Sequence, residues 1–113
     1  DGIAFPENNQ QFINQINIKK MKKISVIITT EYKGVFYGEI DEKDFQNKAS
    51  IEVVNARNVI YWSSITKGFI GLSSDGPNDQ CRIGAKAGGK MIIHGITSVT
   101  MCSPEAEQSW KAL

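Results

Sequence analysis

The feature that most constrains the fold of this chain is a period of two in its apolar residues. Ile24, Val26 and Ile28 recur at every second position, while the polar residues Ser25 and Thr29 fall on the alternate positions. Successive side chains of a β-strand point to opposite faces, so this spacing places the three apolar side chains on one face. The pattern predicts a half-buried strand that begins near residue 24.

Further stretches carry the same strand pattern. A turn at residues 32–34 connects the first strand to a second at residues 35–40, which predicts a hairpin. Residues 41–48 are charged or polar and are expected to form an exposed loop or hairpin tip. The other strand-like segments are residues 50–54, residues 59–62 and the long segment 91–101, with a bulge or bend at Gly95.

The first 23 residues differ from the rest of the chain. Phe12, Ile13 and Ile16 recur at helical spacing before a run of four lysines around Met21, which predicts a short amphipathic helix. The lysines are either a solvated helix end or contacts for phosphates or an acidic membrane surface. Residues 1–23 are therefore expected to be an N-terminal extension.

A second helix is expected at the other end of the sequence. Ser103 is a preferred N-cap residue, and Pro104 suits the first helical position. In the middle of the chain, residues 63–67 form either a single helical turn or a loop. Residues 68–72 are too short and too rich in glycine for a helix of their own, and residues 73–79 have the composition of a loop.

These elements predict a mainly β (α+β) fold. The expected architecture is a small antiparallel barrel or roll of five to six strands, with short N-terminal and C-terminal helices. Residues 24–113 are expected to form a single β-rich domain with the C-terminal helix. A chain of this size buries only about two-thirds of its unfolded surface on folding, so association would help it, and a homo-oligomer is expected.

Charge and cysteine content narrow the choice of partners. Lys and Arg number 13 and Asp and Glu number 12, which gives a net charge of +1. Because proteins that bind nucleic acid usually carry a strong basic field, nucleic acid is not expected as a partner. No apolar run approaches the roughly 20 residues that span a bilayer, so no membrane is expected and the location predicted is intracellular. Cys81 and Cys102 are interpreted as reduced thiols.

Catalytic and metal signatures are incomplete. His94 is the only histidine and lies in a strand-like segment, so it is interpreted as structural. The carboxylates that cluster in residues 39–44 are interpreted as solvated. Residues 84–90 loosely resemble a phosphate-binding loop, but Met91 follows Lys90 where that loop requires Ser or Thr. The sequence therefore predicts no enzyme, no cofactor and no metal site.

The two arginines indicate a different kind of site. Arg57 and Arg82 lie near aromatic and glycine-rich residues, and an arginine fork can bind phosphate bidentately. Tyr61 and Trp62 could stack on bases for roughly 1–3 kcal/mol each. Asn55 precedes a small residue, which predicts a bend or bulge that aims Arg57 away from the plane of its strand. A site for a small phosphorylated nucleotide is predicted, with the candidate residues Asn55, Arg57, Tyr61, Trp62, Ser73, Ser74, Arg82 and Lys86. In the alternative interpretation, Tyr61 and Trp62 form a core or interface pair beside a surface arginine.

Some of these residues also carry a family resemblance. The pattern reads Asn55-Ala56-Arg57, Tyr61-Trp62, Gly71-Leu72, Gly76-Pro77, Arg82-Ile83 and Cys102-Ser103-Pro104-Glu105-Ala106. Over about residues 22–113 the chain resembles an uncharacterised family of small bacteriophage proteins. The resemblance implies a phage protein that acts in the host cytoplasm.

An analogy suggests what such a protein does. Small β-rich phage proteins without catalytic residues include sponges that oligomerise and sequester cyclic-nucleotide or ADP-ribose-type signals of host immunity. By analogy of size, source and site chemistry, we expect non-enzymatic binding and sequestration of such a signal, which is an anti-defence function. Two other classes stay open: a nucleic-acid-binding accessory protein, and a structural or host-protein-binding phage component.

Overall fold

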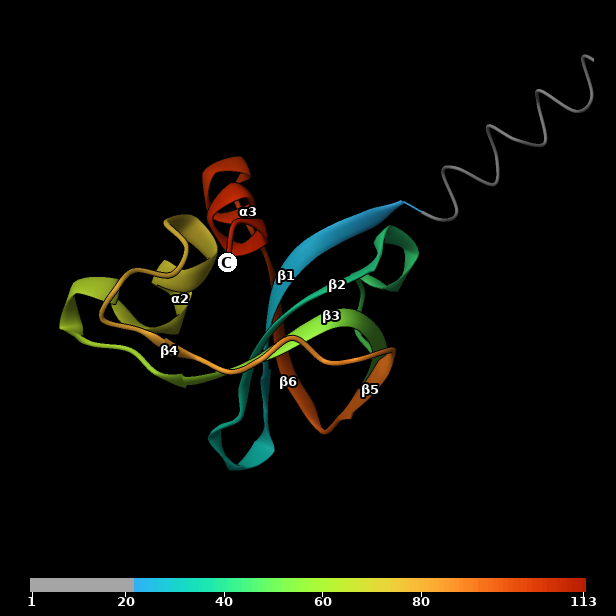
Figure 1. The fold of residues 1–113 in the computed structure, drawn as a ribbon. Coiled ribbons are helices and arrows are strands. Elements are labelled where there is room, and N and C mark those ends of the chain that lie inside the picture. Colours follow the sequence, from blue (N-terminus) through green and yellow to red (C-terminus); the bar gives the residue numbers. More distant parts are fainter. Residues whose placement is uncertain (1–21) are drawn as a thin grey trace, which may run out of the picture.

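The computed structural model describes residues 22–113 (Figure 1). The predicted N-terminal helix lies outside the described residues. The strands are β1 (Lys23–Thr30), β2 (Val35–Asp41), β3 (Ser50–Tyr61), β4 (Arg82–Ile83), β5 (Met91–His94) and β6 (Ile96–Met101). The helices are α2 (Gly68–Ser74) and α3 (Pro104–Lys111), with short 3-10 turns at Glu31–Lys33, Glu42–Asp44 and Ser64–Thr66.

The strands form one antiparallel sheet in the order β4-β3-β2-β1-β6. The long strand β3 pairs with β2, and it also pairs with β4 through its C-terminal half and with β5 through its N-terminal half. The prediction of a mainly β fold of five to six strands with a short C-terminal helix is confirmed, and the described residues contain six strands. The sheet of the described residues is not closed, so the barrel is not confirmed.

A single glycine connects strands at the two edges of this sheet. Strand β5 pairs with β3 and strand β6 pairs with β1, yet only Gly95 separates β5 from β6 in the chain. Gly95 has a φ of 67°, a conformation that glycine adopts without strain. Its carbonyl accepts a hydrogen bond from the Glu31 N–H at 2.9 Å, and the next N–H, of Ile96, donates to the Ala49 carbonyl at 3.2 Å. The irregularity predicted at Gly95 is present, but it divides the single strand expected over residues 91–101 into two strands with different partners. It brings the two edges of the sheet together at one corner (Figure 1).

Strand β1 is buried on both faces of the sheet, with a separate core on each side. Ile24, Val26 and Ile28 of β1 belong to one core cluster, and Ile27 belongs to the other. Ser25 is buried as well. The prediction of a half-buried strand was therefore wrong, because α2 and α3 cover the second face, as Figure 1 shows.

Helix α3 begins as its sequence predicts and is anchored by one aromatic residue. The Ser103 hydroxyl accepts a hydrogen bond from the Ala106 N–H at 3.1 Å. Near the end of the helix, Trp110 is 2% exposed and stacks on Tyr37 of β2, with ring centroids 4.5 Å apart and planes 7° apart. The Trp110 indole N–H donates to the Leu72 carbonyl of α2 at 3.0 Å. One side chain thus joins α3 to the sheet and to the other helix.

Helix α2 contradicts the sequence prediction. Residues 68–72 were expected to be too short and too glycine-rich for a helix, and residues 73–79 were expected to be a loop, but Gly68–Ser74 is helical. Tertiary packing stabilises this helix, since Leu72 is fully buried in the second core. Gly71 contributes by close approach: a Cβ at this position would overlap the Thr66 carbonyl group.

The close approach at Gly71 gives a stability test. Gly71→Ala should lower the free energy of unfolding by about 1–3 kcal/mol, because the backbone of residue 66 cannot move away cheaply. The matched control is Gly88→Ala, whose added Cβ would meet open space, and it should change that free energy by less than about 0.5 kcal/mol. Urea denaturation followed by Trp fluorescence measures both. Equal effects at the two glycines would contradict the packing assigned to α2.

Candidate functional site

A β-bulge in β3 sets the position of Arg57. The pairing with β2 shifts by one residue between Tyr37↔Arg57 and Glu39↔Val54, and Asn55 has a φ of 54°. An extra residue in one strand is the definition of a bulge, so the bulge predicted at Asn55 is confirmed. Arg57 follows it and lies opposite Tyr37, whose side chain belongs to the core beneath the helices.

Arg57 lies at the wall of a groove between β3, β4 and α3. Its Nη1 donates to the Gly84 carbonyl at 2.9 Å, and its Nη2 lies 3.4 Å from the Leu113 carbonyl. Because a guanidinium group has five N–H donors, these contacts hold it in place and leave others free. The groove has a volume of about 620 Å³ and is lined by Arg57, Pro77, Asn78, Asp79, Cys81, Ile83, Ser109 and Leu113.

The charges around this groove are mixed. All five ion pairs found within residues 22–113 are made by lysines, so the guanidinium groups of Arg57 and Arg82 are not neutralised by carboxylates there. Asp79 supplies one carboxylate to the groove lining. The groove therefore offers a fixed cation together with an acceptor for hydroxyl groups.

The predicted aromatic residues lie elsewhere. Trp62 lines a second groove of about 400 Å³, together with Phe69 of α2, Lys33 of the β1–β2 turn and neighbouring threonines. Tyr61 is 53% exposed at the end of β3, where it pairs across the strands with the exposed Arg82. Neither Tyr61 nor Arg82 is among the residues that line the two grooves.

The remaining candidates contribute to the fold or lie on the surface. Ser73 is 4% exposed, and its hydroxyl donates to the Ile70 carbonyl at 2.7 Å. The Ser74 hydroxyl lies 3.4 Å from the Gly71 carbonyl. Lys86 is exposed in the connection between β4 and β5. Within one chain, the structure therefore brings Arg57 and Trp62 to different grooves, and it does not gather the eight candidates into one.

The groove also contains residues that the sequence reasoning missed. Asn78, Asp79 and Ser109 come from a loop and from α3, far from Arg57 in the sequence. Ser109 directly precedes Trp110 in α3. Because Trp110 anchors this helix to the sheet, it also determines that the Ser109 side chain lines the groove. No local signal marks these residues, because only the packing of α3 brings them beside β3.

Comparison with known proteins places this fold in a family. A family model described as a domain of unknown function, DUF6948, matches residues 23–110. The chain belongs to the DUF6948 family. The match confirms the predicted resemblance to an uncharacterised family. No curated protein and no solved structure matches the chain.

Three further properties of this DUF6948 domain bear on its chemistry. Cys81 and Cys102 are both free thiols, as predicted. In the part of the chain that the structure describes, no group of three His, Cys, Asp or Glu side chains could hold a metal ion. Across residues 22–113, every helix is too short or too polar to cross a membrane.

Two side chains of the second core have raised pKa values. Burial, with a smaller effect of the Glu107 charge, raises the pKa of the Cys102 thiol to about 12. Burial also raises the pKa of Tyr37 to about 12, partly opposed by its 2.9 Å hydrogen bond with Ser25. Both groups are therefore neutral at physiological pH, and Cys102 is a poor nucleophile there.

The raised pKa of Cys102 predicts an alkaline loss of stability. The thiol titrates near 9.0 when unfolded and near 12 when folded, so the unfolded chain loses its proton first as the pH rises. The free energy of unfolding should therefore be unaffected by this group below pH 9 and should fall between pH 9 and about 12. Urea denaturation across this range should show a shallower fall for Cys102→Ala, with the residual slope due mainly to Tyr37. Identical slopes would refute the assignment.

Proposed function

We propose that this DUF6948 protein binds a small phosphorylated nucleotide without turning it over, in the groove lined by Arg57. The observation that carries the proposal is the Arg57 guanidinium, fixed by the Gly84 carbonyl at 2.9 Å and unpaired with any carboxylate of the described residues. A fixed fork binds phosphate with little loss of side-chain entropy.

The size of the groove supports a small ligand. Its volume of about 620 Å³ falls within the range of roughly 300–1,000 Å³ that is usual for small-molecule sites. A nucleotide of one or two units fits such a space better than a continuous nucleic-acid strand does. The net charge of +1 also favours a small ligand, because counterion release from a long strand requires a larger basic surface.

Asp79 favours a nucleotide over inorganic phosphate. A carboxylate in a phosphate site is unfavourable unless the ligand also presents hydrogen-bond donors, such as the hydroxyl groups of ribose. Ser109 and Asn78 add a hydroxyl and an amide to the same lining. The pairing of Arg57 with Asp79 therefore suits a ligand that is anionic at one end and rich in hydroxyl groups at the other.

Binding without turnover is the simpler assignment for this lining. Hydrolysis of a phosphate ester usually requires a metal ion or a positioned general base. The residues that line the groove include one carboxylate and no histidine. We therefore assign the protein a sequestering function rather than an enzymatic one.

The finer form of the proposal rests on the resemblance to small phage proteins. In it, the ligand is a cyclic oligonucleotide or ADP-ribose-type signal of host immunity. The protein would act in the cytoplasm of the infected cell as an anti-defence sponge, and its capacity would depend on the number of binding sites, since no ligand is consumed.

The proposal predicts the effect of two arginine variants. Arg57→Lys keeps the charge but loses the fork, and Arg57→Ala loses both. We expect weaker nucleotide binding in both, by roughly ten- to hundredfold for Arg57→Ala. Isothermal titration calorimetry with cyclic dinucleotides and ADP-ribose measures the affinity, and chromatography of the recovered ligand tests for turnover.

The control is Arg82→Ala, on β4 outside the groove lining. Unchanged affinity in this variant supports a site within one chain, while an equal loss supports a site shared by two subunits that also draws on Arg82 and Tyr61. The proposal fails if the wild-type protein binds none of these nucleotides at micromolar concentration, or if the ligand is recovered hydrolysed.

A further inference from the structure

The groove beside Trp62 has an apolar wall that belongs to the second core. Its volume of about 400 Å³ falls within the range of roughly 300–1,000 Å³ that is usual for small-molecule sites. Trp62 and Phe69 both line it, and both are partly buried against that core. Val35, a buried member of the core, is also part of the lining. Aromatic side chains that stay partly open to solvent offer a stacking surface for a planar ring.

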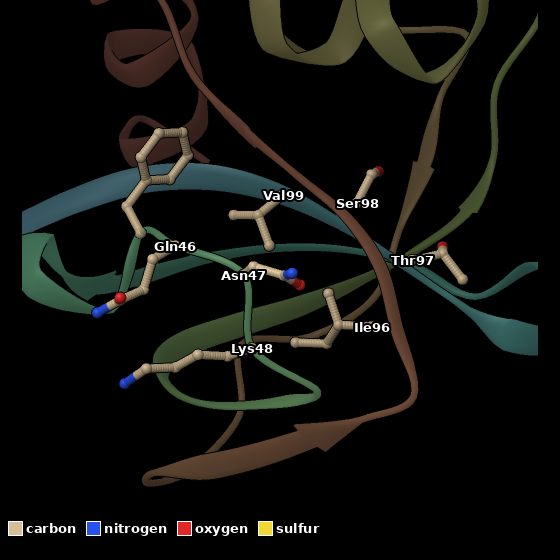
Figure 2. Close-up of a pocket in the computed structure, with 8 residues that line it drawn as sticks. Gln46, Asn47, Lys48, Ile96, Thr97, Ser98 and Val99 are labelled. Carbon is tan, nitrogen blue, oxygen red and sulfur yellow. The ribbon is translucent and has the colours of Figure 1, made fainter.

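A second part of the lining consists of hydroxyl groups. The pairing of β6 with β1 shifts after Thr29, which leaves Thr97 as the extra residue of a bulge, and Figure 2 shows Thr97 and Ser98 on the same side of β6. Their hydroxyls lie 2.7 and 2.5 Å from the Thr29 hydroxyl and have no other side-chain partner among the described residues. Three hydroxyl hydrogens serve these two contacts, so one O–H is left for a further acceptor. Thr29 and Thr97 both line the groove.

Lys33 brings a positive charge to the same groove. It is exposed in the turn between β1 and β2, and it is part of the groove lining. The five ion pairs found within residues 22–113 involve other lysines, and the described residues that line this groove include no carboxylate. An ammonium group and a spare hydroxyl are both hydrogen-bond donors, so the polar part of the groove suits an anion.

The backbone at Lys33 supports a role for its side chain. The turn has a φ of 62° at Tyr32 and of 68° at Lys33, a left-handed conformation that residues other than glycine rarely adopt. Glycine or asparagine usually occupies such positions of a hairpin turn. Backbone strain of this kind is concentrated at ligand sites, where a particular side chain is needed.

We propose that this groove binds a small aromatic carboxylate. The ring would stack on Trp62 and Phe69, and the carboxylate would accept hydrogen bonds from the Lys33 ammonium and from the hydroxyl groups of Thr29 and Thr97. The site shares no lining residue with the Arg57 groove, so it does not depend on the proposed nucleotide function.

NMR titration of the full chain with indole-3-acetate tests this proposal. The chain has two tryptophans, so its proton–nitrogen correlation spectrum contains two indole N–H signals, which Trp62→Phe would assign. The Trp62 signal should shift with a Kd of about 1 mM or below. The Trp110 signal should shift much less, because this side chain is 2% exposed. Indole-3-acetamide has the same ring without the charge and should bind more weakly.

Two glycine variants separate the charge of Lys33 from the strain of its turn. Lys33→Gly should weaken the binding of indole-3-acetate by about three- to tenfold, because the cation is lost. Its melting temperature should be unchanged or higher, since glycine adopts this φ without strain. The matched control is Tyr32→Gly, which relieves the same kind of strain in the same turn. Tyr32 does not line the groove, so this variant should bind indole-3-acetate as the wild type does.

A further variant distinguishes the two grooves. Arg57→Ala should leave the affinity for indole-3-acetate unchanged, and a loss in this variant would assign the ligand to the other groove and overturn the proposal. The proposal also fails if the Trp62 signal does not shift at millimolar ligand, or if the acetate and the acetamide bind equally well. Equal losses in Lys33→Gly and Tyr32→Gly would likewise contradict it.

Discussion

The contact of Trp110 with Tyr37 and Leu72 is the interaction on which the rest of this structure depends. The stacked rings join α3 to the middle of the sheet, and the indole hydrogen bond joins α3 to α2. Without α3, Tyr37 would lose the ring that stacks on it, and the second core would lose both Ala106 and Trp110. The same contact fixes the neighbouring Ser109, which lines the groove beside Arg57. Stability and the candidate site therefore rest on one anchored helix.

The strands and caps could be predicted because their signals are local. The hairpin, the bulge at Asn55, the bend at Gly95 and the start of α3 each follow from a few adjacent residues. Helix α2 could not be predicted, because its stability comes from the burial of Leu72 and from the close fit of Gly71 against residue 66. The burial of both faces of β1 was missed for the same reason, since residues 68–74 and 104–111 supply the cover.

The candidate site was predictable only in part, because tertiary packing decides which side chains meet in one groove. Arg57 could be identified from its residue type and from the preceding bulge, and it does line a groove. Trp62 is its near neighbour in sequence, yet packing against the second core brings it to a groove with Phe69. Arg57 lies on β3 and Trp62 lies just past its end. The elements packed around this strand, and not the short distance in sequence, determine which groove each side chain lines.

The groove that we propose as functional depends on elements that are far apart in the sequence. Arg57 comes from β3, Ile83 from β4 and Ser109 from α3, and Pro77, Asn78, Asp79 and Cys81 contribute to the same lining. All of these residues belong to one chain, so each copy of the protein offers its own groove. A protein that sequesters a ligand without consuming it can increase its capacity only by adding sites. A groove within one chain is compatible with the proposed function, because the capacity then rises with the number of copies.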